Sequence, residues 1–385
     1  MKWGKVKLGD IADFSNGINF GKDAYQKGIK LISVSDFGNR FSPEYDSLEE
    51  IKEDVVRKND LLSTGDIVFV RSNGNKELVG RCMLIDNPPN KITYSGFCIR
   101  ARFKDITEHD PVFWTYHFKN KAFRRAMSGT AIGANIQNLS QGRLAVYETI
   151  VPDIEGQKSI ANILSAYDNL IENNQKQIKL LEEAAQRLYK EWFVDLCFPG
   201  HENVAIVNGV PEGWKKELIG DLIGKVIRSK QVKTAEYLKE GAIPVIDQSR
   251  NFIAGYTNDL ETIVDMSCPV IVFGDHTRIL KYIQFPFAKG ADGTQLIVSD
   301  NENMPQSLLY YSLIAVDLSN YHYARHFKYL KAESILVPSK EISNEFDRYV
   351  APMLLQVQQL RNTSYKAAEA RDRLLPKLMS GEIEV

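Results

Sequence analysis

Two long segments of the chain repeat apolar residues in alternating steps of four and three positions. The first segment spans residues 157–193, and the second begins near Phe346. This spacing is typical of the narrow seam of a coiled coil, because a helix on a globular surface buries a broader stripe. The residues of the first seam are Ile160, Ile163, Tyr167, Leu170, Asn174, Gln177, Leu181, Ala184 and Leu188. At ~1.5 Å per residue, we expect a first helix roughly 55 Å long.

The second seam has the same form. Each seam has a polar centre, which is Asn174 and Gln177 in the first seam and Ser364 in the second. The residues of the second seam are Phe346, Val350, Met353, Val357, Leu360, Ser364, Ala367, Arg371, Leu374 and Leu378. We expect Pro376 to end or bend this helix, since proline removes a backbone donor and clashes with the preceding turn. Each seam needs a partner. The simplest is the other seam, packed antiparallel in the same chain, and the alternative is a coiled coil between chains.

The regions outside the helices have the pattern of mixed α/β globules. Residues 66–70 and 269–273 are short, apolar and rich in β-branched residues, and polar turn residues follow each of them. These runs predict two buried strands. Residues 81–85 predict another strand, and residues 110–127 and 306–316 have helical apolar spacing.

Segments of the first globule return in the second. The opening Trp3-Gly4-Lys5-Val6-Lys7-Leu8-Gly9-Asp10-Ile11 matches residues 214–222 at Trp, Gly, Asp and the last aliphatic position, and the Val-Pro pair at 151–152 returns at 337–338. An internal repeat of this kind implies a pseudo-two-fold molecule. We therefore predict an α/β protein with two globules, residues 1–152 and 200–338. Two helical segments, residues 153–199 and 339–385, separate them and form an antiparallel coiled coil.

Charge and composition exclude several classes of protein. The formal net charge is -1, so any surface that binds nucleic acid must arise from local clustering of basic residues. The sequence contains no run of 18 or more apolar residues, and its start lacks the apolar stretch of a signal peptide. The four cysteines are far apart, as expected for reduced thiols. We expect a cytoplasmic protein with no membrane association.

Catalytic motifs are weak or missing. Residues 87–90, Asn-Pro-Pro-Asn, approach the Asn-Pro-Pro-aromatic tetrapeptide of adenine methyltransferases, but Asn90 replaces the aromatic residue. His322 and His326 have the i, i+4 spacing of a metal site on a helix, yet no cysteine or carboxylate cluster accompanies them. The sequence has no phosphate-binding glycine loop, no zinc-protease motif and no nucleophile elbow. We therefore predict no catalytic residue and no metal ligand.

Polar and basic loops are better candidates for function. Arg, Asn and similar side chains can read base edges in the major groove, and basic side chains on a helix can contact phosphates. In the first globule the candidate DNA contacts are Arg71, Ser72, Asn73, Asn75, Lys76, Arg81, Lys121, Arg124, Arg125, Asn135 and Asn138. In the second they are Asp275, His276, Thr277, Arg278, Lys281, Tyr323, Arg325 and His326. Solvated turns and a solvated helix face are the alternative interpretation.

Taken together, these features resemble the specificity subunit of type I restriction–modification systems over nearly the whole chain. The resemblance rests on the Trp openings at Trp3 and Trp214, the Val-Pro entries, and the order and spacing of longer segments. These segments are residues 157–174, the Gly-Asp-His-Thr-Arg of 274–278, the Gly-Ala-Asp-Gly of 290–293 and residues 373–383.

The resemblance implies two target-recognition domains that each read one half of a gapped sequence in double-stranded DNA. The helices would act as a ruler and as the docking site for two methyltransferase subunits, and restriction subunits that translocate and cleave DNA would join them. S-adenosylmethionine and ATP with Mg²⁺ would bind those partners, and this chain would bind no cofactor. Two other interpretations stay open: an adaptor whose globules bind proteins, and a standalone DNA-modifying enzyme. Salt-dependent, sequence-selective DNA binding distinguishes recognition from the adaptor.

Overall fold

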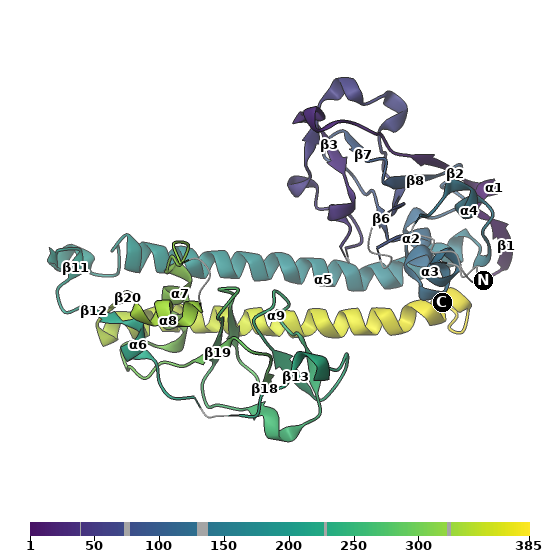
Figure 1. Ribbon diagram of the computed structural model, residues 1–385. Coiled ribbons are helices and arrows are strands. Elements are labelled where there is room, and N and C mark those ends of the chain that lie inside the picture. Colours follow the sequence, from purple (N-terminus) through teal and green to yellow (C-terminus); the bar gives the residue numbers. More distant parts are fainter. Residues whose placement is uncertain (39, 73–77, 129–137, 227–228, 322–324) are drawn as a thin grey trace. The chain divides into compact units, whose positions relative to one another are not determined.

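The two predicted long helices are α5 (Ile154–Tyr189, 36 residues) and α9 (Lys340–Ser380, 41 residues). The computed structural model describes residues 1–38, 40–72, 78–128, 138–226, 229–321 and 325–385. The chain divides into unit 1, Met1–Asn173 with Ser364–Val385, and unit 2, Asn174–Thr363. The division falls within both long helices, so each unit contains a part of α5 and a part of α9 (Figure 1).

In unit 1 the two helices run antiparallel. Asp168 of α5 forms an ion pair with Arg371 of α9, and the Tyr116 hydroxyl from the globule donates to the same carboxylate at 2.5 Å. Ile160, earlier on α5, belongs to the same buried core as Leu378, later on α9. One carboxylate therefore links the globule of unit 1 to both of its helices.

Unit 2 pairs its own parts of the helices in the same sense. Glu182 of α5 contacts Arg361 of α9 at 2.6 Å, and the rings of Tyr189 and Phe346 lie edge to face with centroids 6.3 Å apart. The guanidinium of Arg361 also lies 4.3 Å from the ring centroid of Phe252 in the globule. The predicted antiparallel pairing within one chain is thus present in each unit.

Three details of the helices differ from the predictions. Ala184 of the first seam is exposed, whereas Ala185, outside the predicted seam, is fully buried. Leu170 is 41% exposed, whereas Leu164, outside the predicted seam, is fully buried because the globule of unit 1 packs on that part of α5. Pro376 does not end α9, which continues to Ser380 and places Leu378 and Met379 in the core of unit 1. This burial offsets the hydrogen bond lost at the proline.

Unit 1 contains two sheets and a strand pair. The antiparallel sheet has the strand order β2 (Ala12–Asn16), β8 (Cys98–Phe103), β5 (Ile67–Val70), β6 (Cys82–Leu84). The second sheet has the order β4 (Glu50–Ile51), β3 (Tyr25–Ile32), β7 (Ile92–Tyr94). The helices of the globule are α1 (Leu8–Ile11), α2 (Pro111–Lys119), α3 (Lys121–Ser128) and α4 (Gln141–Ala145). The predicted helix of residues 110–127 is interrupted at Asn120, whose backbone is extended.

Unit 2 repeats this plan with a different number of strands. One sheet has the order β17 (Leu280–Ile283), β16 (Val270–Gly274), β19 (Thr294–Ile297). The other has the order β14 (Gly255–Thr257), β13 (Ile243–Ile246), β18 (Phe287–Lys289), β15 (Ile263–Val264). A hairpin precedes them, β10 (Ile206–Val207) with β11 (Val210–Pro211). The helices of the globule are α6 (Ile219–Leu222), α7 (Gln306–Ala315) and α8 (His326–Ala332).

The repeated sequence segments pair with each other in both units. In unit 1 the opening strand β1 (Trp3–Lys7) lies antiparallel to β9 (Glu148–Pro152), which carries the Val-Pro pair. In unit 2, β12 (Lys215–Leu218) pairs in the same way with β20 (Ser334–Val337). In each unit the conserved ends of the repeat therefore join the globule to the helix that follows it.

The predicted buried strands β5 and β16 occupy equivalent places. Ile67 and Phe69 of β5 face the core of α2 and the long helices, while Val68 and Val70 face the core between the two sheets. In unit 2 the β16 side chains alternate in the same way between two cores. A strand with both faces buried has a continuous apolar run, which explains why the sequence pattern identified both.

Candidate nucleic-acid interface

Three segments of unit 1 meet where β5 ends. The Arg71 amide donates to the Phe97 carbonyl at 2.8 Å, and the Arg71 carbonyl accepts from the Leu139 amide at 2.8 Å. Ser72 forms an isolated antiparallel bridge with Asn138. The structure thus brings together Arg71, Ser72 and Asn138, which come from two of the loops that we predicted to contact DNA.

The same three segments meet in unit 2 where β16 ends. The Asp275 amide donates to the Gly293 carbonyl at 2.7 Å, and the Asp275 carbonyl accepts from the His326 amide at 2.9 Å. Asp275 therefore has the backbone partners that Arg71 has in unit 1. We call these three hydrogen-bonded segments the loop frame: residues 71–72, 95–97 and 138–139 in unit 1, and residues 275–278, 290–293 and 325–326 in unit 2.

Arg71 and Asn138 have the exposure that a contact with DNA requires. Arg71 is half-buried, and its guanidinium donates to the Gly96 carbonyl at 3.2 Å, which holds the side chain beside the loop frame. Asn138 is exposed. The predicted contacts Asn73, Asn75, Lys76, Asn135 and Tyr323 lie outside the described residues, as does His322.

The predicted basic face of unit 1 is only partly available. Lys121 and Arg125 of α3 are exposed, and Arg81 and Arg124 are half-buried. Burial lowers the pKa of the Arg124 guanidinium, and the nearby charge of Arg81 lowers it to a smaller extent. Lys119 on the preceding helix has an internal partner instead, because its ammonium donates to the Arg40 carbonyl at 2.8 Å.

Three predicted contacts in unit 2 are buried, and we withdraw them as contacts with DNA. The Asp275 side chain accepts from the Phe327 amide at 2.7 Å and so satisfies a free donor at the start of α8. The ammonium of Lys281 donates to the carbonyls of Asp247 at 2.7 Å and Asn251 at 2.5 Å. The His326 ring nitrogens lie 2.8 Å from the Asp275 carbonyl and 3.0 Å from that of Tyr321. The hydrogen bonds of these three buried side chains stabilise the conformation of the loops.

The surface of the unit 2 loop frame comprises His276, Thr277, Arg278 and Arg325, all of them exposed. Arg278 has a left-handed backbone, with φ of 60°, and its guanidinium donates to the Tyr321 carbonyl at 3.1 Å. A non-glycine residue in this conformation is uncommon and is found where surrounding contacts fix it, often at functional sites. Arg278 is therefore the leading candidate for a contact in unit 2.

Gln248 organises this loop frame, and the sequence analysis missed it. Its side-chain oxygen accepts from the His276 amide at 3.1 Å, and its amide nitrogen donates to the Asp292 carbonyl at 2.9 Å. Its backbone carbonyl accepts from the Thr277 hydroxyl at 2.7 Å. The signal available was the polar run at residues 247–251, directly after the apolar strand β13.

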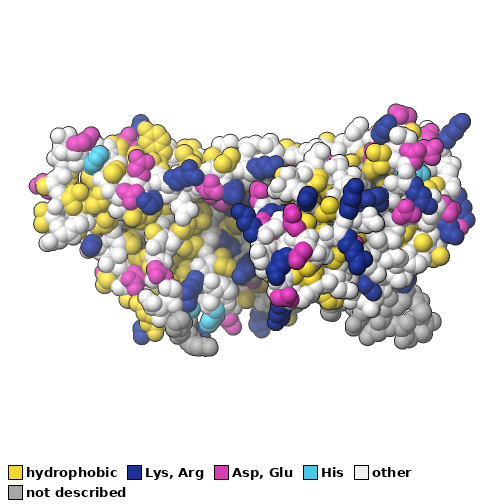
Figure 2. All heavy atoms as spheres, turned by 90° about the horizontal axis from the view of Figure 1, so that it is seen from above, with side chains coloured by type: hydrophobic (Ala, Val, Ile, Leu, Met, Phe, Trp, Pro, Cys, Tyr) yellow, Lys and Arg dark blue, Asp and Glu magenta, His cyan; other side chains and the backbone are white. Residues whose placement is uncertain are grey.

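On the face that Figure 2 shows, charges of both signs are mixed. Figure 2 shows Lys and Arg side chains interspersed with Asp and Glu over the visible face, without a continuous field of one sign. In the described part of the chain, no group of three or more His, Cys, Asp or Glu could hold a metal ion. The same residues include no helix that is long and apolar enough to cross a membrane.

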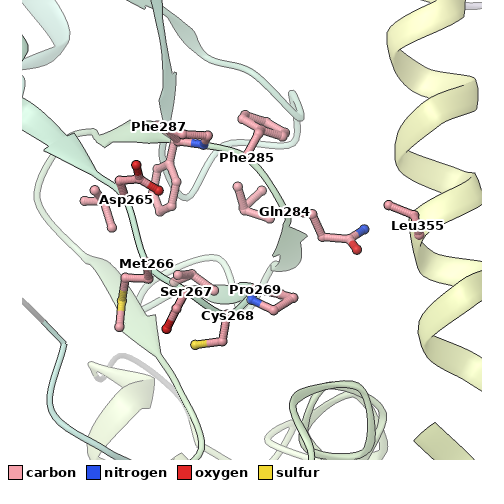
Figure 3. Close-up of a pocket in the computed structure, with 13 residues that line it drawn as sticks. Asp265, Met266, Ser267, Cys268, Pro269, Gln284, Phe285, Phe287 and Leu355 are labelled. Carbon is pink, nitrogen blue, oxygen red and sulfur yellow. The ribbon is translucent and has the colours of Figure 1, made fainter. Parts of the chain in front are cut away.

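One pocket of about 250 Å³ lies in unit 2, away from the loop frame. Met266, Cys268 and Phe285 line it, and Leu355 of α9 closes one side (Figure 3). None of the predicted site residues contributes to its lining. Its walls are mostly apolar, and the polar side chains of the lining are Asp265, Ser267, Cys268 and Gln284.

Comparison with known proteins agrees with this geometry. Residues 1–183 match the family model described as the type I restriction modification DNA specificity domain. The MjaIX specificity subunit of Methanocaldococcus jannaschii is 26% identical over 313 residues, which is 74% of this chain and 72% of that protein. By these matches the chain is similar to type I restriction–modification specificity subunits.

Other specificity subunits match in part or in fold. The HindI specificity subunit of Haemophilus influenzae is 27% identical over 203 residues, which is 50% of this chain and 41% of that protein. The crystal structure of the S subunit from M. genitalium has the same fold, with a TM-score of 0.64 and 17% identity over 98% of this chain and 96% of that one. The likeness in fold of a specificity subunit thus extends over both units, beyond the residues that the family model matches.

Proposed function

We propose that this chain recognises a two-part DNA sequence for a type I restriction–modification complex, with unit 1 reading one part and unit 2 the other. The observation that carries the proposal is the duplicated loop frame. The same backbone hydrogen bonds, from Arg71 in unit 1 and from Asp275 in unit 2, support different exposed side chains. A shared frame with different tips suits a protein that reads two different half-sites.

The exposed and half-buried side chains at and near the loop frames have the chemistry of base and phosphate contacts. The candidates that remain are Arg71, Ser72, Arg81, Lys121, Arg124, Arg125 and Asn138 in unit 1, and His276, Thr277, Arg278 and Arg325 in unit 2. Arginine can bind guanine O6 and N7 with two hydrogen bonds, and asparagine can bind adenine N6 and N7 in the same way. Since the net charge is near zero, affinity would depend on these local groups and on partner subunits that enclose the DNA.

The long helices supply the second part of the proposal. They would dock two methyltransferase subunits, and restriction subunits would join the assembly for cleavage. The catalytic sites would belong to those partners, which would bind S-adenosylmethionine and ATP with Mg²⁺. The relatives support this division, because each is named as a specificity subunit.

Selection from a pool of random DNA duplexes tests recognition directly. The chain in complex with its methyltransferase subunit should enrich duplexes with two short fixed sequences separated by a gap of fixed length. The binding constant should fall steeply with salt, because phosphate contacts release counterions. Enrichment of no sequence by a stable complex would favour the protein-binding adaptor.

A further inference from the structure

Phe97 is an exposed aromatic residue within the unit 1 loop frame. Its side chain is 62% exposed, and it is the only phenylalanine or tryptophan among the exposed large apolar residues of the described chain. Single exposed apolar residues are common on proteins, so exposure alone indicates nothing. The position of Phe97 is what gives it meaning, because its carbonyl accepts from the amides of both Arg71 and Ser72.

The turn that carries Phe97 is tightly packed against the rest of the globule. The Gly96 amide donates to the Ile18 carbonyl at 2.7 Å. A Cβ atom on Gly96 would lie 2.1 Å from the side-chain oxygen of Asn19, and one on Gly17 would lie 2.2 Å from the Ser95 carbonyl. At Gly17 the nearest atoms are all backbone, so only glycine at this position permits the two segments to approach so closely. Phe97 is therefore presented on a fixed backbone, which limits the entropy lost when it meets a ligand.

Unit 2 has no counterpart of this aromatic residue. Gly293 takes the equivalent position, because its carbonyl accepts from the Asp275 amide as that of Phe97 accepts from the Arg71 amide. Gly293 has φ of 85°, and its neighbour Asp292 is polar. The difference predicts that an aromatic contact from this position of the loop frame is made by unit 1 and not by unit 2.

We propose that Phe97 is a specificity-determining residue that contacts the C5-methyl group of a thymine in the half-site read by unit 1. Thymine is the base with an apolar group in the major groove, and phenylalanine is one of the side chains that contact it there. Arg71 and Asn138 in the same loop frame supply the polar groups that read neighbouring base edges in that groove. The inference rests on the proposed function, since it requires that unit 1 reads DNA.

The test replaces thymines of the target by uracil, which removes the methyl group alone. The target is first obtained from the N6-methyladenine motif of cells that co-express the chain with its methyltransferase subunit. Affinities of the purified complex are then measured for duplexes with uracil at each thymine position in turn. Uracil at one of these positions should weaken the binding of the wild-type complex about fourfold, which corresponds to the loss of one buried methyl group. The Phe97→Ala complex should bind thymine and uracil equally well at that position.

Two further variants control the experiment. Ile106→Ala removes an apolar side chain of unit 1 that is also 62% exposed but lies outside the loop frame, so its complex should bind and discriminate like the wild type. Phe97→Leu should keep part of the preference for thymine, because it keeps apolar bulk at the tip. Thermal unfolding of all three variants should match the wild type, since the replaced groups are exposed.

Several outcomes would overturn the role of Phe97. One is a target that contains no thymine in either half. Another is a loss of affinity on uracil substitution that is equal in the wild-type and Phe97→Ala complexes. A third is a Phe97→Ala complex that binds and discriminates like the wild type. A further test places the fluorescent base 2-aminopurine beside the sensitive thymine of the target. A rise in its fluorescence on binding would also overturn the role of Phe97, because that signal reports an unstacked base and hence insertion of the side chain between base pairs. In each of these cases the two-part motif persists, whereas its absence refutes the proposed function itself.

Discussion

At the end of its buried strand, unit 1 carries Arg71, whereas unit 2 carries Asp275 at the equivalent position. Both residues make the same two backbone hydrogen bonds, yet Arg71 is half-buried beside the exposed Asn138 and Asp275 is buried beneath α8. The backbone hydrogen bonds of the loop frame do not depend on which side chain the residue has. The side chains are therefore free to differ, and a position that contacts a ligand in one unit can hold a loop in the other.

The comparison predicts its largest effect for Asp275→Ala. The substitution removes a buried carboxylate and leaves the partly buried Phe327 amide without its acceptor, and it should destabilise unit 2 by about 2–3 kcal/mol. Arg71→Ala should change the stability of unit 1 by less than about 0.5 kcal/mol, as is usual for side chains near the surface. Hydrogen exchange in residues 270–337 and 67–139 measures the two effects separately. Equal losses of protection would refute the different roles of these two residues.

The pH dependence of stability should also differ between the units. Burial lowers the pKa of His117 in unit 1 to about 4 and that of Lys281 in unit 2 to about 8. In both cases the unfolded chain binds the proton more tightly, so stability rises with pH between the folded and unfolded pKa values. Unit 1 should therefore lose about 2 kcal/mol from His117 between pH 7 and pH 5, and unit 2 should gain about 2 kcal/mol between pH 7.5 and pH 9.5.

Two variants isolate these contributions. His117→Phe should remove the acid sensitivity of unit 1, because the ring lies among aromatic residues and its Nδ1 has no hydrogen-bond partner. Lys281→Met should remove the alkaline gain of unit 2. Urea unfolding followed by hydrogen exchange across the pH range reports both, and unchanged pH profiles in the variants would contradict the assignment.

Single substitutions should also change the affinity for DNA, and each unit should affect a different half-site. Arg71→Ala should weaken binding about tenfold through one half-site, and Arg278→Ala about tenfold through the other, as expected for the loss of one base contact. The double variant should lose about 100-fold, because contributions of independent sites add in free energy. Duplexes in which one half-site is scrambled identify the affected half. If both variants affect the same half, the units do not divide the target.

Effects of a size similar to the loss of one base contact should come from the helix ion pairs. Arg371→Gln removes the partner of Asp168, which also binds the Tyr116 hydroxyl, and should destabilise unit 1 by about 1–2 kcal/mol. Arg361→Gln should cost unit 2 about 0.5–1 kcal/mol, because its pair with Glu182 is more exposed. Chemical unfolding in low and high salt compares them, and a larger loss for Arg361→Gln would reverse the ranking.

The sequence predicted the long helices and the buried strands better than the exposure of the loop side chains. The strands β5 and β16 were identified because strands with both faces buried have continuous apolar runs, and the helices because their apolar residues recur with a fixed period. Leu170 was assigned wrongly because the pattern does not reveal where a globule covers a helix. Of the two outcomes expected at Pro376, an end of the helix was wrong, because the local cost of the proline is smaller than the burial that follows it, and a bend stays a prediction.

The candidate site was predicted only in part for a related reason. Asp275, His276, Thr277 and Arg278 are consecutive and polar, and composition does not distinguish the buried first residue from the exposed three that follow it. Gln248 and Phe97 were missed because their roles depend on segments that are distant along the chain. Gln248 accepts a hydrogen bond from the His276 amide and donates one to the Asp292 carbonyl, and the Arg71 amide donates to the Phe97 carbonyl. These bonds exist only after the chain has folded.

Mapping of N6-methyladenine tests the central claim most directly. The chain would be expressed with its methyltransferase subunit in a host that lacks this modification, and the genome sequenced for methylated adenines. The account predicts a two-part motif with a gap of fixed length, in which exchange of the unit 1 globule for that of a relative changes one half and leaves the other. An uninterrupted motif, or no methylation by a stable and active complex, would contradict it.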